Sequence, residues 1–319
     1  MTKLFAQPYD ITANGFFFET AGALRFANRE GGPFLAAERS RIPPLIELPR
    51  LLSATERLLD EDDTDEDLRL LLAPGSSLGG ARPKASVRDK DGHLAIAKFP
   101  RRDDEINTVA WKAFALTLAA RSGLPVPDWR LESVADKPVI LLRRFDRTDG
   151  CRVPFLSAMS MLGATDNESR SYLEFVDALR RHGAAPNKDM EQLWRRIVFS
   201  ILISNTDDHL RNHGFLYAGG QGWRLSPAYD LNPVPADVKP RVLTTAIDLD
   251  DGTASLDLAY SVARYFGLKE VEAKQIARST GEAVSNWRDI AANMGLAPAE
   301  ISRMSSAFEH GDLDAARAA

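Results

Sequence analysis

The feature that most limits the fold of this chain is a change in the spacing of its apolar residues near residues 148–155. Before that point, short apolar runs alternate with turn signals, and the Asp91-Gly92 pair predicts a hairpin from 84-KASV-87 to 93-HLAIAKF-99. After it, apolar residues recur at helical spacing through most of residues 171–183, 189–204, 254–266, 269–292 and 297–309. We therefore predict an α+β protein with two lobes, a strand-containing lobe over residues 1–147 and an all-helical lobe over residues 148–319.

Composition excludes several classes of protein. The 319 residues carry a net charge of -5, which argues against a chain that binds nucleic acid through its own overall charge. The single cysteine, Cys151, cannot form an internal disulfide and fits a reducing compartment. The N-terminus lacks the form of a signal peptide, and no apolar run approaches the roughly 18 residues that a membrane span needs. We therefore expect a cytoplasmic protein without membrane contact.

A dense polar segment, 203-ISNTDDHLRNHGFLY-217, follows directly after the apolar run that ends at Leu202. It places Asp207 and Asn212 in an Asp-x4-Asn pattern, and a further acid, Asp230, follows in 225-LSPAYDLNP-233. Phosphoryl transfer uses such a set, with one carboxylate to orient the attacking hydroxyl and an Asn and a second Asp to hold Mg²⁺. By itself an Asp-x4-Asn pattern also fits a capped turn, so the prediction depends on the rest of the chain.

The N-terminal half supplies the phosphate-binding features that this chemistry requires. The small-residue segment 75-GSSLGGARPK-84 could let backbone N–H groups approach phosphate oxygens. Lys98 ends an apolar segment, at the place where a strand lysine would reach the α- and β-phosphates of ATP. These features and the three polar residues of the second half occur in the order found in protein kinases.

With these segments in view, the sequence resembles the HipA family, the serine/threonine kinases of bacterial toxin–antitoxin operons. The similarity runs from about residue 22 to 310 and is most specific in 75-GSSLGGARPKASV-87, 95-AIAKFP-100, 142-LRRFDR-147, 205-NTDDHLRNHGF-215 and 223-WRLSPAYDLNPVP-235. The resemblance implies a two-lobed, protein-kinase-like fold with ATP between the lobes. It also implies roles for individual residues.

In this resemblance Asp207 is the catalytic base, and Asn212 and Asp230 are the Mg²⁺ ligands. Ser77 is the expected site of an autophosphorylation that silences the kinase, and Ser76 is the alternative. The residues expected near the nucleotide are the phosphate-loop residues Ser77, Gly79, Gly80, Arg82 and Lys84, the strand lysine Lys98, Arg143 and Phe145 of the adenine hinge, and His209.

Neighbouring polar residues have structural explanations that we prefer. We expect Asp208 to bind a neighbouring backbone N–H, although it could replace Asp207 as the base. His213 is expected to be a packed loop histidine. A kinase normally pairs its strand lysine with a Glu on the next helix, and many members of the family that this chain resembles have a Glu at the position that reads Lys112 here. Glu105 is a possible substitute, or the strand lysine is held in another way.

The implied function is that of an ATP- and Mg²⁺-dependent toxin kinase. Its expected partners are a helix-turn-helix antitoxin of the HipB type and a protein substrate such as an aminoacyl-tRNA synthetase, with DNA reached only through the antitoxin. Longer family members carry an additional N-terminal subdomain, which a small separate protein could supply here. The alternatives are an impaired pseudokinase that serves as a binding module in a repressor complex, for which Lys112 argues, and a small-molecule or lipid kinase.

Overall fold

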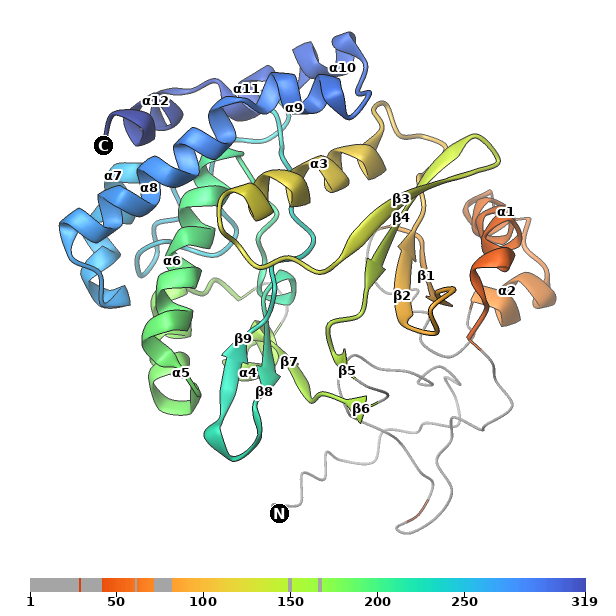
Figure 1. Cartoon of the computed structure of the whole chain (residues 1–319), viewed down its shortest axis with the longest axis horizontal. Coiled ribbons are helices and arrows are strands. Elements are labelled where there is room, and N and C mark those ends of the chain that lie inside the picture. Colours follow the sequence, from red (N-terminus) through yellow and green to blue (C-terminus); the bar gives the residue numbers. More distant parts are fainter. Residues whose placement is uncertain (1–28, 30–41, 61, 72–81, 149–150, 166–167) are drawn as a thin grey trace.

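The structure is a computed structural model that describes residues 29, 42–60, 62–71, 82–148, 151–165 and 168–319. In Figure 1 the C-terminal helices gather on one side of the molecule, and a four-stranded sheet with two short helices forms the other. The predicted α+β fold class with two lobes is confirmed by this arrangement and by its likeness to known folds, given below.

The N-terminal lobe is built on an antiparallel sheet in the order β1-β2-β4-β3. The predicted hairpin is present, and Gly92 in its turn has a φ of 80°, a conformation that glycine adopts without strain. The elements of this lobe are η1 (Leu45–Glu47), α1 (Leu48–Leu59), α2 (Asp65–Leu71), β1 (Lys84–Arg88), β2 (Leu94–Lys98), α3 (Thr108–Arg121), β3 (Trp129–Val134) and β4 (Lys137–Arg143).

The central strand β4 is buried on both faces, because successive side chains of a strand point to opposite sides. Val139 and Leu141 join a small core beneath α1, whereas Ile140 and Leu142 join the large core that contains α3. Helix α3 is apolar almost all round and lies between the sheet and the helices α8 and α9 (Figure 1). It therefore shares its core with the C-terminal half, and the predicted lobe boundary at residues 147 and 148 stays a prediction.

Helix α3 is capped by Asn107, whose side chain accepts a hydrogen bond from the Ala110 N–H at 3.0 Å. Asp104, just before the helix, accepts hydrogen bonds from Arg82 and Thr108, so its carboxylate is engaged by side chains. Burial of residues such as Phe114 in the core stabilises this position by roughly 1.5–3 kcal/mol per side chain.

The C-terminal half is mostly helical, and the predicted segments are helical, although 269–292 and 297–309 are each divided into two helices. Helix α5 has a capping box in which Ser171 and Glu174 satisfy each other's backbone N–H groups. The helices are α4 (Ala158–Met161), α5 (Tyr172–His182), α6 (Pro186–Leu202), η2 (Leu210–Asn212), η3 (Gly219–Gln221), α7 (Leu256–Val262), η4 (Ala263–Phe266), α8 (Glu270–Ser285), α9 (Trp287–Asn293), α10 (Pro298–Arg303), α11 (Ser305–Phe308) and α12 (Gly311–Ala318).

The expectation of an all-helical second half was wrong in one respect. Strands β7 (Phe155–Ser157), β8 (Gly214–Tyr217) and β9 (Trp223–Leu225) form a three-stranded antiparallel sheet, and β5 (Arg147–Thr148) pairs with β6 (Cys151–Arg152). These strands have two to four residues, too few to produce a clear alternation of apolar and polar positions. None of the helices in the described ranges is long and apolar enough to span a bilayer.

Candidate active site

The polar segment forms a loop that leaves the buried end of α6 and returns in β8. Ser204, just past the helix, has a φ of 50°, an uncommon conformation for a residue other than glycine. Its hydroxyl donates to the Ala307 carbonyl at 2.9 Å, and Asn205 donates to the Ser200 hydroxyl at 3.2 Å. These contacts with buried elements hold the start of the loop in place.

Asp207 lies exposed on this loop, whereas its backbone is fixed. The Asn212 side-chain amide donates to the Asp207 carbonyl at 2.6 Å, so the two residues of the Asp-x4-Asn pattern are in direct contact. This hydrogen bond uses the amide nitrogen of Asn212. Its amide oxygen, the atom that could bind a cation, accepts no hydrogen bond from the part of the chain that the structure describes. The arrangement leaves the Asp207 carboxylate exposed and the Asn212 amide oxygen without a hydrogen bond from the described residues.

Asp208 has the structural role that we expected, and so has His213. Asp208 is 1% exposed and accepts hydrogen bonds from the Tyr172 hydroxyl at 2.5 Å and the Thr244 N–H at 2.7 Å. Burial raises the pKa of Asp208 to about 6, against the lowering effect of these donors. His213 packs against Tyr172 and Phe175, and burial lowers its pKa to about 3. This network supports the loop from below.

Asp230 lies opposite, and lysines from the N-terminal lobe converge on it. The Lys98 ammonium lies 2.9 Å from Asp230 Oδ1, and Lys112 donates to the same oxygen. Burial raises the pKa of Asp230, but the charges of Lys98 and Lys112 outweigh burial and hold the pKa well below its usual range. Asp230 also has a φ of 55°, and strained backbone of this kind costs about 1–3 kcal/mol and concentrates at functional sites.

Asn232 connects Asp230 with the loop that contains Asp207, a role that the sequence did not indicate beyond its nearness to Asp230. Its backbone N–H donates to Asn205 Oδ1 at 3.0 Å, and its side-chain oxygen accepts from Lys112 at 2.6 Å. Its side-chain nitrogen lies 3.5 Å from Asp207 Oδ2. Asn232 therefore joins the proposed base, the proposed metal ligand and Lys112 in one network.

The residues predicted to bind phosphate divide into those that lie near Asp230 and those that do not. Lys84 pairs with Lys98 across β1 and β2, and burial and the Lys98 charge lower the pKa of Lys84. Arg82 is held by Asp104 at 2.7 Å and by Thr108 at 3.0 Å, so its guanidinium is engaged there. The remaining predicted phosphate-loop residues, Ser76, Ser77, Gly79 and Gly80, lie outside the described residues.

The predicted adenine hinge borders the same region. Phe145 lies with its ring 5.7 Å from that of Tyr229, the neighbour of Asp230. The Arg143 side chain is exposed and contacts His93 at 3.2 Å, so only its backbone could serve a hinge. His209 is half-buried at the start of η2, and its carbonyl accepts from the Asn212 N–H at 2.8 Å.

A buried arginine lies beneath the network and was not predicted to belong to it. Arg196 of α6 is 2% exposed and donates to the Ser226 carbonyl at 2.8 Å. Burial lowers its pKa to about 10. It lines a small cavity of about 10 Å³ together with Asn205, Asp208, Asn212 and Asp230. Its charge therefore lies under both proposed metal ligands.

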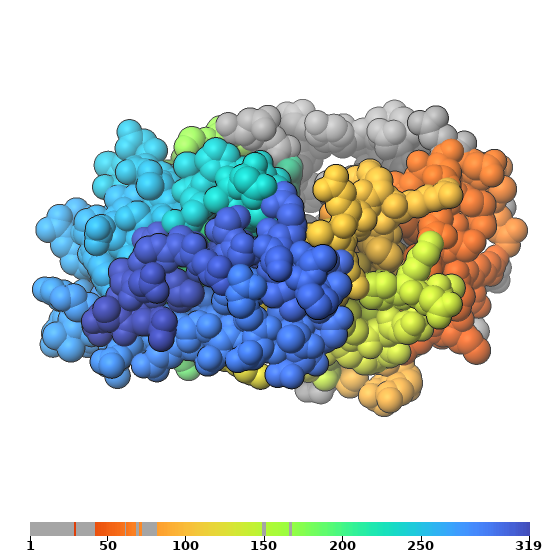
Figure 2. Space-filling model, turned by 90° about the horizontal axis from the view of Figure 1, so that it is seen from above, coloured from red at the N-terminus to blue at the C-terminus, as the bar shows by residue number. Residues whose placement is uncertain are grey.

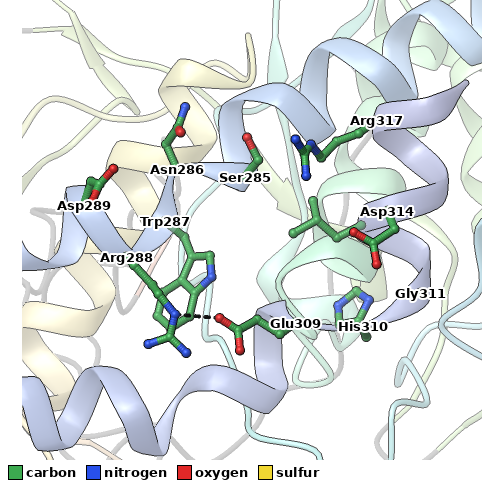
Figure 3. A pocket seen from close by; sticks show the side chains of 11 residues that line it. Ser285, Asn286, Trp287, Arg288, Asp289, Glu309, His310, Gly311, Asp314 and Arg317 are labelled. Carbon is green, nitrogen blue, oxygen red and sulfur yellow. Dashed lines mark hydrogen bonds and ion pairs between the residues drawn. The ribbon is translucent and has the colours of Figure 1, made fainter.

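Figure 2 shows an opening between the gold atoms of the N-terminal half and the blue and teal atoms of the C-terminal half. A surface hollow of about 570 Å³ lies elsewhere, between α9 and α12 (Figure 3). There Arg288 lies 4.6 Å from the Trp287 ring centre and pairs with Glu309, so these side chains satisfy one another. This hollow contains none of the residues that the sequence singled out.

The donor set fits Mg²⁺ and a polyphosphate. Asn212 and Asp230 provide oxygen atoms, and Mg²⁺ needs few protein ligands because it keeps several waters. Three lysines, Lys84, Lys98 and Lys112, surround the single carboxylate of Asp230, which leaves an excess of positive charge for an anion. Within the described ranges, His, Cys, Asp and Glu form no group of three or more that could hold a metal ion by themselves.

Comparisons with known proteins agree with this geometry. The family model described as "HipA-like C-terminal domain" matches residues 76–287, more than half of the chain. The chain belongs to the HipA-like family. The matched range contains both the lysines of the N-terminal lobe and the Asp207–Asp230 region.

Two curated relatives carry the name of a kinase. "Putative kinase Y4mE" of Sinorhizobium fredii is 29% identical over 258 residues, which cover 70% of this chain and 58% of that protein. A "Putative kinase" of Haemophilus influenzae is 24% identical over 227 residues and covers 62% of this chain and 66% of that protein. The chain thus spans a little over half the length of the first of these relatives and about two thirds of the second.

Two solved structures have a similar fold. HipA of Shewanella oneidensis, in a complex with HipB and operator DNA, matches with a TM-score of 0.69 and 16% identity over 97% of this chain and 80% of that one. The Helicobacter pylori proinflammatory kinase CtkA matches with a TM-score of 0.58 and 16% identity over 77% of this chain and 94% of that one. The fold is therefore kinase-like and resembles that of these two proteins.

Proposed function

We propose that the protein is an ATP- and Mg²⁺-dependent serine/threonine protein kinase of the HipA toxin type. The observation that carries the proposal is the meeting of Lys98 with Asp230, 132 residues apart in sequence, next to Asp207 and Asn212. Strand lysine, base and two oxygen ligands are the parts that phosphoryl transfer requires.

In this proposal each of the four residues has its own role in phosphoryl transfer. ATP would supply the phosphoryl group, and Mg²⁺ would neutralise charge on its phosphates. Asn212 and Asp230 would hold the cation, and Lys98 would hold the phosphates. Asp207, which is exposed, would accept the proton of the target hydroxyl while the hydroxyl oxygen forms its bond to phosphorus and ADP leaves.

The wider biological role is a further part of the proposal. The name of the Shewanella structure describes HipA with HipB and operator DNA, which supports a HipB-like, helix-turn-helix antitoxin as partner. DNA contact through that partner fits the net charge of -5. We propose an aminoacyl-tRNA synthetase as the type of target, and Ser77 or Ser76 as the site of silencing autophosphorylation, on the basis of the family resemblance.

The test is the intact mass of the protein after incubation with ATP and Mg²⁺, followed by mapping of any phosphate. We expect wild type to gain phosphate at Ser77 or Ser76, and Asp207→Asn to slow this gain by about 10²–10⁴-fold while still binding ATP. Asp177→Asn, an exposed acid on α5, is the matched control and should behave like wild type.

A second candidate is a pseudokinase that acts as a binding module, because Lys112 occupies the metal-binding carboxylate. The kinase proposal is refuted, and the binding module is favoured, if wild-type protein that starts unphosphorylated and binds ATP transfers no phosphate from it. Transfer that persists in Asp207→Asn at the wild-type rate would show that Asp207 is not the base.

A further inference from the structure

One oxygen of the Asp230 carboxylate accepts hydrogen bonds from two ammonium groups. Lys98 lies 2.9 Å from Oδ1, and Lys112 donates to that same atom. The other oxygen, Oδ2, accepts no hydrogen bond from the part of the chain covered by the structure. With 30% of its side chain exposed, Asp230 can be reached from outside. The carboxylate is thus occupied on one side by cations and open on the other.

Lys112 is held more firmly than Lys98. Its side chain is 11% exposed, and it donates to Asn232 Oδ1 at 2.6 Å as well as to Asp230. Lys98 has one partner, Asp230, in the described part of the chain. Glu105, the possible substitute for the missing helix carboxylate, is exposed and forms no ion pair with Lys98 there. An incoming anion could therefore take Lys98 away from Asp230, while Lys112 would stay.

The charges around Lys112 favour an anion. Lys98 lies near Lys112 and is paired across the sheet with Lys84, whereas Arg82 is bound by Asp104. In other kinases the corresponding helix residue is an acid that pairs with the strand lysine. Here the sign of the charge at that position is reversed.

We propose that Lys112 is a positioning residue that acts as a built-in cation at Asp230, competing with a divalent cation for this carboxylate and supporting nucleotide binding without metal. The inference rests on the proposed ATP-binding function. Its physical basis is that an ammonium group on Oδ1 reduces the negative charge that the carboxylate offers to a metal. The same ammonium group attracts phosphate, so Lys112 weakens the binding of a divalent cation and strengthens the binding of metal-free nucleotide.

The test is calorimetric titration of the full chain with ATP, first in EDTA and then over a series of MgCl₂ concentrations. Lys112→Met keeps the apolar part of the side chain and removes its charge. We expect it to weaken ATP binding in EDTA by about tenfold and to lower the half-saturating Mg²⁺ concentration by a similar factor. Lys112→Arg keeps the charge and should stay nearer to wild type in both measurements. Lys188→Met removes an exposed lysine of α6 and is the matched control.

The outcomes separate the inference from the proposed function. If Lys112→Met leaves both quantities unchanged, or weakens ATP and Mg²⁺ binding together, the inference is wrong, and parallel weakening indicates a merely structural lysine. Lys112→Glu extends the test, because a negative charge at this position should weaken ATP binding in EDTA more than Lys112→Met does. If folded wild-type protein binds no ATP with or without Mg²⁺, the proposed function and the inference both fail.

Discussion

The buried pair of Tyr172 and Asp208 provides a sharp test of how the loop that contains Asp207 is supported. Tyr172→Phe removes a hydroxyl that donates to Asp208 Oδ2 at 2.5 Å, and both side chains are almost fully buried. Asp208 then keeps its backbone donors, such as the Thr244 N–H at 2.7 Å, but loses its side-chain donor. The effect on stability should depend on whether Asp208 is ionised.

The direction in which stability changes with pH follows from the pKa of Asp208, which burial raises from 3.8 to about 6 in the folded protein. Because the folded state binds this proton more tightly than the unfolded chain, stability falls as pH rises from about 4 through 6. The difference of about two pKa units corresponds to about 3 kcal/mol. The Tyr172 hydroxyl offsets part of this cost by stabilising the carboxylate, so its removal raises the pKa of Asp208 further.

A lost hydrogen bond to a charged acceptor costs about 1.5–3 kcal/mol, whereas one between neutral groups costs about 1 kcal/mol. We therefore expect Tyr172→Phe to lose about 1 kcal/mol of unfolding free energy at pH 5 and about 2–3 kcal/mol at pH 8. Denaturant unfolding at both pH values measures the difference. Tyr217→Phe, on a tyrosine that is 41% exposed, is the control and should change little at either pH. Equal losses for Tyr172→Phe at pH 5 and pH 8 would refute this account of Asp208.

Two further substitutions test how the surrounding elements are held. Gly214→Ala would place a Cβ 2.2 Å from Cε2 of the Phe155 ring, and we expect a loss of about 1–3 kcal/mol in denaturant unfolding as that ring is displaced. An unchanged midpoint would show that Phe155 moves aside freely. Asp189→Ala removes a carboxylate that binds Arg224 at 2.8 and 3.0 Å, and it should lower the unfolding free energy by about 2 kcal/mol, less than for a fully buried pair because Arg224 is 37% exposed. A loss below about 0.5 kcal/mol would show that this pair adds no more than a surface salt bridge.

Local signals in the sequence were sufficient for most individual elements. The Asp91-Gly92 turn predicted the β1–β2 hairpin, and apolar periodicity predicted α5 and α6, because turn chemistry and helix amphipathicity act between residues close in the chain. The order of Lys98, Asp207, Asn212 and Asp230 along the chain was enough to suggest kinase chemistry. Short strands such as β7 carried too few residues for the same reasoning.

Only the tertiary structure decided how these residues meet. The sequence alone determined that this is a two-part α+β chain of the HipA-like family, with Lys112 at a position where an acid is usual. It could not indicate that Lys112 contacts Asp230 and Asn232, which lie 118 and 120 residues further along the chain. Those contacts exist because α3 is buried between the sheet and the C-terminal helices, which brings its lysine to Asp230 and Asn232. The energy of such a contact depends on the packing of several distant elements, and no short stretch of sequence contains that information.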